Sequence, residues 1–179
     1  MNIWHNISPK RITSDQFYAV IEISKGGKNK YELDKETGLL KLDRVLFTST
    51  HYPANYGFIP RTYAEDGDPL DVLVLCSETI QPMTLVECKP IGVLKMIDND
   101  SGDEKIIAVP VNDPNYNSYN DVKELPKHRF QEIKHFFEVY KMLEGEDMQT
   151  SVTEISGVKK AKDVIKKAIE SYIRDFQLA

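Results

Sequence analysis

Apolar and polar positions alternate with a two-residue period along much of the first half of the chain. Residues 17–24 alternate over their whole length, which is typical of a β-strand. The Gly-Gly pair at 26–27 and the renewed alternation at 30–33 predict a hairpin. Residues 39–47 are strand-like as well. This part of the chain is therefore predicted to be β-structure.

Two further apolar segments predict strands of different kinds. The run Val72-Leu73-Val74-Leu75 is continuously apolar and predicts a fully buried strand. Residues 85–97 predict a long β segment, which Pro90 and Gly92 interrupt. A proline and a glycine inside a strand indicate a bend or bulge, as strongly curved barrels need. Residues 105–111 predict the strand that follows.

The last third of the chain changes to helical periodicity. Pro126 marks a helix start and Gly145 a helix end. Two sets of apolar side chains recur every three or four residues: Phe130, Ile133, Phe137 and Tyr140, then Ala161, Ile165, Ala168, Tyr172 and Phe176. Many strands followed by two helices predict an α+β fold that is mainly β, with a barrel or curved sheet and two helices packed on it.

Composition and charge narrow the class of protein. A chain of 179 residues predicts one domain, residues 1–179. The net charge of −5 argues against nucleic acid as the main partner. No apolar run approaches a membrane span, and residues 1–11 lack a secretory h-region. Cys76 and Cys88 have no metal or redox spacing, so reduced thiols and a cytoplasmic location are expected.

Three carboxylates crowd into the six residues just before the buried strand. Asp66, Asp68 and Asp71 are separated by a glycine and a proline, which make the turn stiff. Such a turn can simply be solvated. Three anionic groups held together also repel one another, and a hard cation among them removes that repulsion. An EF-hand is excluded because the position that needs a glutamate is Ser77.

A second acidic cluster lies at the end of another predicted strand. Residues 98–105 contain Asp98, Asp100 and Asp103. By itself this cluster is typical of a solvated hairpin loop. Two clusters at strand ends, together with several cations, favour a metal and phosphate site. Neither a Walker A motif nor a GxGxxG motif is present, and no histidine has zinc spacing.

Several other polar residues fit such a site. Glu22 is an acid within a strand, although a solvated edge position is the more common reason for a single glutamate there. Arg44 shares a strand face with leucines, where a guanidinium needs an anionic partner. The candidate phosphate binders are Lys30, Arg44, Lys105, Tyr140 and Lys141.

The stretch Asp66-Gly67-Asp68-Pro69-Leu70-Asp71-Val72 resembles the signature of the soluble family I inorganic pyrophosphatases, and the length resembles their prokaryotic type. Further segments resemble that family in order and spacing: Glu22, Lys30-Tyr31-Glu32, Asp43-Arg44, Tyr52-Pro53, Asn55-Tyr56-Gly57, 92–96, 98–105 and 135–141. The resemblance implies a five-stranded, OB-like closed barrel with two flanking helices. It also implies hydrolysis of pyrophosphate to two phosphates by direct attack of a metal-activated water. Several Mg²⁺ ions, with Mn²⁺ as a possible substitute, and a homohexamer belong to this expectation.

The resemblance also implies a role for each matching residue. Asp68 would take the proton from the attacking water, and Tyr56 would add a hydroxyl near it. The metal sites would use Asp66, Asp71, Asp98 and Asp103, with Glu22 and Glu32 in support. The phosphates would be bound by Lys30, Arg44, Tyr56, Lys105, Tyr140 and Lys141.

Two positions depart from the family pattern. Asn99 stands where many relatives carry an acid. Val158, which follows Gly157, stands where many relatives carry an aromatic residue. Two other functions stay open at this point. One is a non-catalytic OB-like barrel that binds nucleic acid, which the acidic clusters oppose. The other is a metal-dependent phosphatase for larger phosphate esters or polyphosphate.

Overall fold

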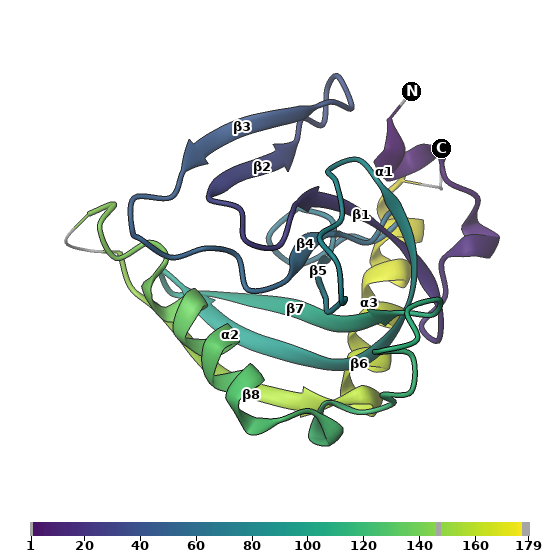
Figure 1. The fold of residues 1–179 in the computed structure, drawn as a ribbon. Helices are drawn as coiled ribbons and strands as arrows, with labels where there is room; N and C mark the ends of the chain where they lie inside the picture. The colour runs from purple at the N-terminus through teal and green to yellow at the C-terminus, as the bar shows by residue number, and fades with distance from the viewer. Residues whose placement is uncertain (1, 146–147, 177–179) are drawn as a thin grey trace.

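The computed structural model describes residues 2–145 and 148–176, and it contains two sheets (Figure 1). The larger sheet has the order β1-β4-β5-β7-β6-β8, and β2 pairs with β3 in a separate two-stranded ribbon. Strand β1 also pairs with β6, so β1, β4, β5, β7 and β6 form a ring of pairings. The strands are β1 (Phe17–Ile23), β2 (Asn29–Leu33), β3 (Leu40–Val45), β4 (Asn55–Phe58), β5 (Asp71–Val74), β6 (Leu85–Asp98), β7 (Ser101–Pro110) and β8 (Thr150–Gly157).

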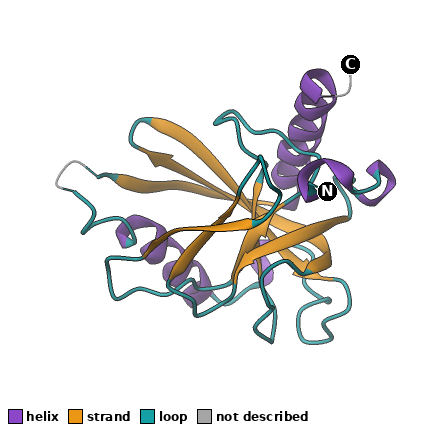
Figure 2. Cartoon of the chain, turned by 90° about the horizontal axis from the view of Figure 1, so that it is seen from above, coloured by secondary structure: helices purple, strands orange, loops and turns teal. Residues whose placement is uncertain are grey.

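Helices cover the two faces of this sheet. The α-helices are α1 (Ile3–Asn6), α2 (Lys127–Val139) and α3 (Val158–Phe176), and the 3₁₀ turns are η1 (Pro9–Arg11) and η2 (Val122–Glu124). The two long helices lie apart from one another (Figures 1 and 2), and Trp4 of α1 packs against Phe176 at the end of α3, with their ring centroids 5.2 Å apart. None of the described helices is long and apolar enough to cross a membrane.

The continuous apolar run of β5 is buried on both faces, as its composition predicts. Leu73 and Leu75 pack in the same cluster as α2, whereas Val72 and Val74 pack in the cluster that includes α3. Strand β7, the parallel neighbour of β5, divides its alternate residues between the same two clusters. Parallel strands covered on both faces lose the apolar–polar alternation of a half-exposed strand.

The predicted interruption of the long strand is confirmed. Strand β6 changes register against β7 between Pro90 and Gly92. A Cβ atom at Gly92 would lie 2.2 Å from Cγ1 of Val122 and 2.7 Å from the carbonyl oxygen of Ser156. Glycine is therefore required here for close approach of β8 and η2, and the bulge lets β6 curve.

Asn99, one of the two departures from the family pattern, lies in the turn between β6 and β7. Asn99 and Asp100 have φ values of 47° and 68°, so both residues of the turn are left-handed. Asparagine and aspartate tolerate this conformation better than other non-glycine residues. The turn therefore gives Asn99 a backbone role of its own.

The tail after Gly145 contains one strand that the sequence pattern did not indicate. Strand β8 extends the sheet beyond β6, and the register pairs Gly92 with Gly157. Most of its side chains are exposed or half-buried, so it lacks a clear apolar face. Its strand conformation comes from hydrogen bonding to β6, which is a tertiary contact.

The Asp121 carboxylate connects the start of η2 to the start of α3. It accepts hydrogen bonds from the backbone N–H groups of Lys123 and Val158, both at 3.0 Å. These donors hold the pKa of Asp121 below its usual range, against the effect of burial. We expect Asp121→Ala to lower the free energy of unfolding by about 1–2 kcal/mol, because two helix starts lose their cap.

The stabilisation by Asp121 depends on its charge. Because the pKa is lowered in the folded state, the contribution is complete at pH 7 and is lost as the pH falls through the folded pKa. Denaturant unfolding of wild type and Asp121→Ala should therefore differ most at neutral pH and converge below about pH 4. An equal difference at every pH would show that the charge does not contribute.

Candidate active site

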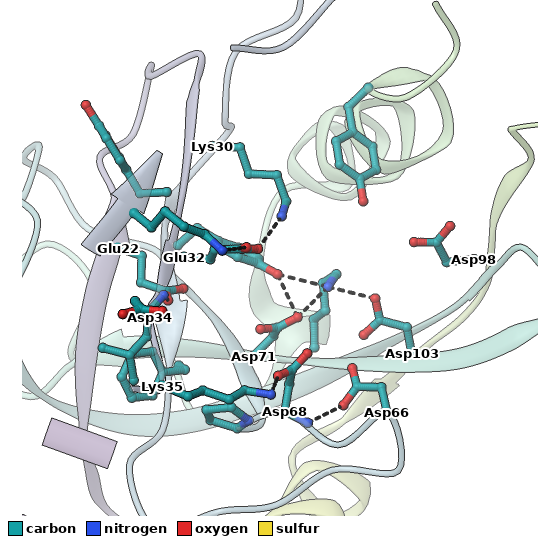
Figure 3. A pocket seen from close by; sticks show the side chains of 18 of the residues that line it. Glu22, Lys30, Glu32, Asp34, Lys35, Asp66, Asp68, Asp71, Asp98 and Asp103 are labelled. Atoms are coloured by element: carbon teal, nitrogen blue, oxygen red, sulfur yellow. Dashed lines mark hydrogen bonds and ion pairs between the residues drawn. The ribbon is translucent and has the colours of Figure 1, made fainter. Parts of the chain in front are cut away.

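One cleft collects the polar residues that the sequence singled out. It has a volume of about 630 Å³ and lies between the β2–β3 ribbon, the acidic turn that precedes β5, and the β6–β7 hairpin. Figure 3 shows carboxylates from these segments pointing toward one another. Every predicted site residue except Arg44 lines it: Glu22, Lys30, Glu32, Tyr56, Asp66, Asp68, Asp71, Asp98, Asp103, Lys105, Tyr140 and Lys141.

The acidic turn is held at its base by a small set of hydrogen bonds. The backbone N–H of Ile59 donates to the carbonyl of Leu70 at 2.9 Å. The buried hydroxyl of Thr62 donates to the Ile59 carbonyl and accepts from the Leu70 N–H. Gly67 has a φ of 83°, a conformation that favours glycine. The turn is therefore a fixed platform for its three aspartates.

Strand register brings the buried Lys105 beside two carboxylates. Lys105 on β7 is the register partner of Asp71 on β5, and Asp103 lies two residues earlier on the same face of β7. The ammonium nitrogen lies 2.7 Å from Asp71 Oδ2 and 2.9 Å from Asp103 Oδ2. Burial by itself would lower the pKa of Lys105, but the surrounding Asp71, Tyr56 and Asp103 raise that pKa well above its ordinary value. Lys105 is therefore a fixed positive charge in the cleft.

Tyr56 lies on β4 and completes this group. Its hydroxyl donates to Asp71 Oδ2 at 2.6 Å and accepts from the Lys105 ammonium at 3.0 Å. Burial, and then the charge of Asp71, raises the pKa of Tyr56 well above 10. The hydroxyl therefore stays protonated at neutral pH and acts as a hydrogen-bond donor.

Crowding and burial raise the pKa of three carboxyl groups in the cleft. Burial raises the pKa of Asp66 and Asp103, with a smaller contribution from the charge of Asp71. Burial, followed by Asp71, raises the pKa of Glu22 to about 8. Glu22 is only 6% exposed and accepts the backbone N–H of Leu33 at 2.8 Å. A solvated edge position for Glu22 is therefore excluded.

The ribbon contributes cations to the opposite wall of the cleft. Lys30 lies 3.2 Å from Glu32 Oε2 and 3.5 Å from Asp43 Oδ2. Arg44 does not line the cleft, because its guanidinium pairs with Asp43 and Glu144. The leucine face expected around Arg44 is buried only in part, since Leu46 is 3% exposed but Leu42 is 51% exposed.

The end of α2 supplies Tyr140 and Lys141. Tyr140 is buried, and burial raises its pKa above the ordinary value. The Lys141 ammonium pairs with Asp98 Oδ2. The second oxygen of Asp98, Oδ1, is buried and has no hydrogen-bond partner among the described residues. An unpaired buried carboxylate oxygen is costly unless a further group binds it.

The donor set of the cleft fits a hard cation. Its ligand atoms are carboxylate oxygens, which Mg²⁺ prefers, and the Asp98 oxygen is free to bind one. No group of three acidic, histidine or cysteine side chains in the described part of the chain would hold an ion by itself. Mg²⁺ commonly uses only one or two carboxylates and completes its shell with water and substrate phosphates.

Four charged residues to which the sequence pattern assigned no role also line the cleft: Asp34, Lys35, Glu36 and Lys41. Asp43, which the family resemblance included without a role, pairs with both Lys30 and Arg44. Lys35 lies in the Asp34–Gly38 turn, where a lysine has no distinctive pattern. Their roles follow from how the ribbon lies over the acidic turn, which the local sequence does not indicate.

The cleft lies within a segment that matches a known protein family. A sequence model of the family described as inorganic pyrophosphatase matches residues 19–173, which includes every residue of the cleft. The chain belongs to the inorganic pyrophosphatase family. The predicted family resemblance is confirmed.

Relatives within the inorganic pyrophosphatase family match nearly the whole chain. Soluble inorganic pyrophosphatase 2 of Chlamydomonas reinhardtii is 47% identical over 94% of this chain and 87% of its own length. The inorganic pyrophosphatase of Picrophilus torridus is 44% identical and covers 96% of both chains. The solved structure of the Helicobacter pylori enzyme has a TM-score of 0.88 and 43% identity, covering 93% of this chain and 98% of its own. The predicted prokaryotic type agrees with these matches, since the archaeal and bacterial proteins align with this chain over nearly their whole length.

Proposed function

We propose that this chain hydrolyses inorganic pyrophosphate to two phosphates in the cleft described above. Family membership supports the reaction, and the grouping of Asp71, Lys105, Asp103 and Tyr56 supports the place. A divalent cation, Mg²⁺ or alternatively Mn²⁺, would activate water and neutralise developing charge there. Asp66, Asp71, Asp98 and Asp103 would hold several such ions, with Glu22 and Glu32 in support.

Side chains of the cleft carry out proton transfer and phosphate binding. Asp68 accepts the proton of the attacking water, because it projects from the fixed acidic turn and is half-exposed in the cleft. Tyr56 donates a hydrogen bond near the nucleophile. Lys30, Lys105, Tyr140 and Lys141 bind the phosphates in the cleft, where their positive charges and hydroxyl stabilise the leaving phosphate. Arg44 would join them by exchanging its partner Glu144 for a phosphate, since it does not line the cleft itself. Water attacks phosphorus directly, without a covalent intermediate.

The broader setting belongs to the same proposal. The ring of strand pairings supports a five-stranded, OB-like closed barrel, and residues 1–179 form one catalytic domain, of which 1, 146–147 and 177–179 lie outside the described residues. The free thiols of Cys76 and Cys88 support the cytoplasm. Pyrophosphate is the partner; neither nucleic acid nor a membrane is proposed.

A homohexamer is the assembly that we propose. Exposed apolar side chains support self-association. They lie on or beside β3 and after α2: Leu39, Leu42, Val45, Phe47, Met142 and Leu143. Sedimentation of the purified protein should give a mass near six chains, and a monomer at all concentrations would contradict the assembly.

Phosphate release from pyrophosphate tests the function directly. We expect rapid release in Mg²⁺, slower release in Mn²⁺, and loss of release when a chelator removes the metal. Nucleoside triphosphate and polyphosphate serve as competing substrates under the same conditions. Faster turnover of either would identify a phosphatase for larger substrates, and no release from folded protein would leave a binding role.

A further inference from the structure

Lys35 reaches from the β2–β3 ribbon to the acidic turn (Figure 3). Its ammonium pairs with the Asp68 carboxylate and donates to the carbonyl of Gly67 at 3.1 Å. Among the described residues, no other cation lies within ion-pair distance of Asp68. Lys35 therefore contacts both the side chain and the backbone of the turn that carries the proposed proton acceptor.

The N-terminal segment fixes the position of Lys35. The carbonyl of Lys35 accepts a hydrogen bond from the Asn2 side-chain amide at 2.8 Å. The Lys35 ammonium lies 5.7 Å from the centroid of the Trp4 ring, which favours a cation over its face. The indole of Trp4 in turn donates to the carbonyl of Thr62 at 2.9 Å, at the base of the acidic turn. The lysine is thus held at its backbone and at its charged end.

This contact joins two parts of the site that belong to different sheets. The ribbon carries Lys30, Glu32 and Arg44, whereas the acidic turn leads into β5 of the larger sheet. Glu22 connects β1 with the end of β2 through the Leu33 N–H. Lys35, two residues further on, connects the ribbon to the acidic turn itself. Lys35 therefore provides a direct side-chain contact between the ribbon and the acidic turn.

We propose that Lys35 is a positioning residue for Asp68. It holds the Asp68 carboxylate and the acidic turn at the separation from the phosphate-binding ribbon that proton transfer requires. This inference rests on the proposed function of the cleft. A displacement of about 1 Å in a reacting group can cost a hundredfold in rate, so even an exposed contact can have a large kinetic effect.

Steady-state kinetics of Lys35→Met and Lys35→Arg in saturating Mg²⁺ test the proposal. We expect Lys35→Met to lower kcat for pyrophosphate by about tenfold or more, with KM little changed. Lys35→Arg should recover most of the rate, since it keeps the charge and the reach. The melting temperature should hardly change, because the pair is about half-exposed and such pairs contribute little stability.

A matched lysine–aspartate pair provides the control. Lys162 on α3 pairs with Asp15 at 2.6 Å and is similarly exposed, but it lies outside the cleft. Lys162→Met should leave both kcat and KM at their wild-type values. If Lys162→Met lowered kcat as much as Lys35→Met does, the effect would come from the change in net charge alone, and the proposal would be overturned.

A double-mutant cycle separates positioning from other roles. In an Asp68→Asn background, adding Lys35→Met should lower the residual rate by less than about twofold, since the group it positions is gone. An undiminished loss there would overturn the proposal. So would an unchanged kcat, or a raised KM with normal kcat, which would mean that Lys35 only attracts the anionic substrate. Failure of the wild type to hydrolyse pyrophosphate would instead overturn the proposed function.

Discussion

Asp68→Asn is expected to lower pyrophosphate turnover by about 10²- to 10⁴-fold. The amide has nearly the same shape as the carboxylate but cannot accept the proton of the attacking water. Because Asp68 is 53% exposed on a turn whose base is fixed by Thr62, the substitution should leave the fold intact. Phosphate release at saturating Mg²⁺ measures the loss, and thermal unfolding measures the stability.

Asp15→Asn is the matched control for Asp68→Asn. Asp15 is an exposed aspartate that pairs with a lysine outside the cleft, so its amide variant should keep wild-type turnover. Wild-type turnover in Asp68→Asn would remove Asp68 from the role of proton acceptor. A normal maximal rate with a greatly increased Mg²⁺ requirement would instead make it a metal ligand.

Lys105→Met is expected to damage both catalysis and stability. Lys105 is 3% exposed, and its removal leaves Asp71 and Asp103 facing each other without a cation between them. Removing one member of a buried charge group commonly costs 3–5 kcal/mol, and we expect about 3 kcal/mol because both aspartates keep some contact with solvent. Loss of a positive charge at the leaving phosphate should also lower kcat/KM by about 10²- to 10³-fold.

Denaturant unfolding in chelator and in Mg²⁺ distinguishes the two effects. If the carboxylates accept a metal, Mg²⁺ should restore part of the lost stability by supplying positive charge, while kcat/KM stays low. Lys95→Met is the control, since Lys95 makes an exposed pair with Glu104 on the same hairpin and should change stability by less than about 0.5 kcal/mol. Unaltered stability of Lys105→Met in chelator would contradict the role assigned to its charge.

If Lys35 positions Asp68, the N-terminal segment also affects the geometry of the site. Asn2 and Trp4 contact Lys35, and Lys35 contacts the turn that carries Asp68. A residue in an unremarkable turn can thus affect the reaction without contacting substrate. Its effect is expected in kcat rather than in stability.

The sequence by itself predicted the elements whose local pattern is strong. The buried β5, the bend in β6 and the helices α2 and α3 all follow from apolar spacing, proline and glycine. The predicted end of the first helix at Gly145 was wrong, because α2 ends at Val139 and a turn follows it. A cation at the acidic turn was also predicted, because carboxylates crowded beside a buried strand repel one another unless a cation lies among them. The individual ligand roles came from the family resemblance. Strand β8 was missed since its side chains show little burial and its pairing with β6 is a contact between distant segments.

Only the tertiary structure decided how these residues meet. The parallel register of β5 and β7 places Lys105 against Asp71, and burial between strands raises the pKa of Glu22 to about 8. The position of the ribbon lets Arg44 pair with Glu144 and lets Lys35 pair with Asp68. Spacing along a chain determines which residues share a face, but distances between segments depend on register, twist and packing, which no local pattern contains.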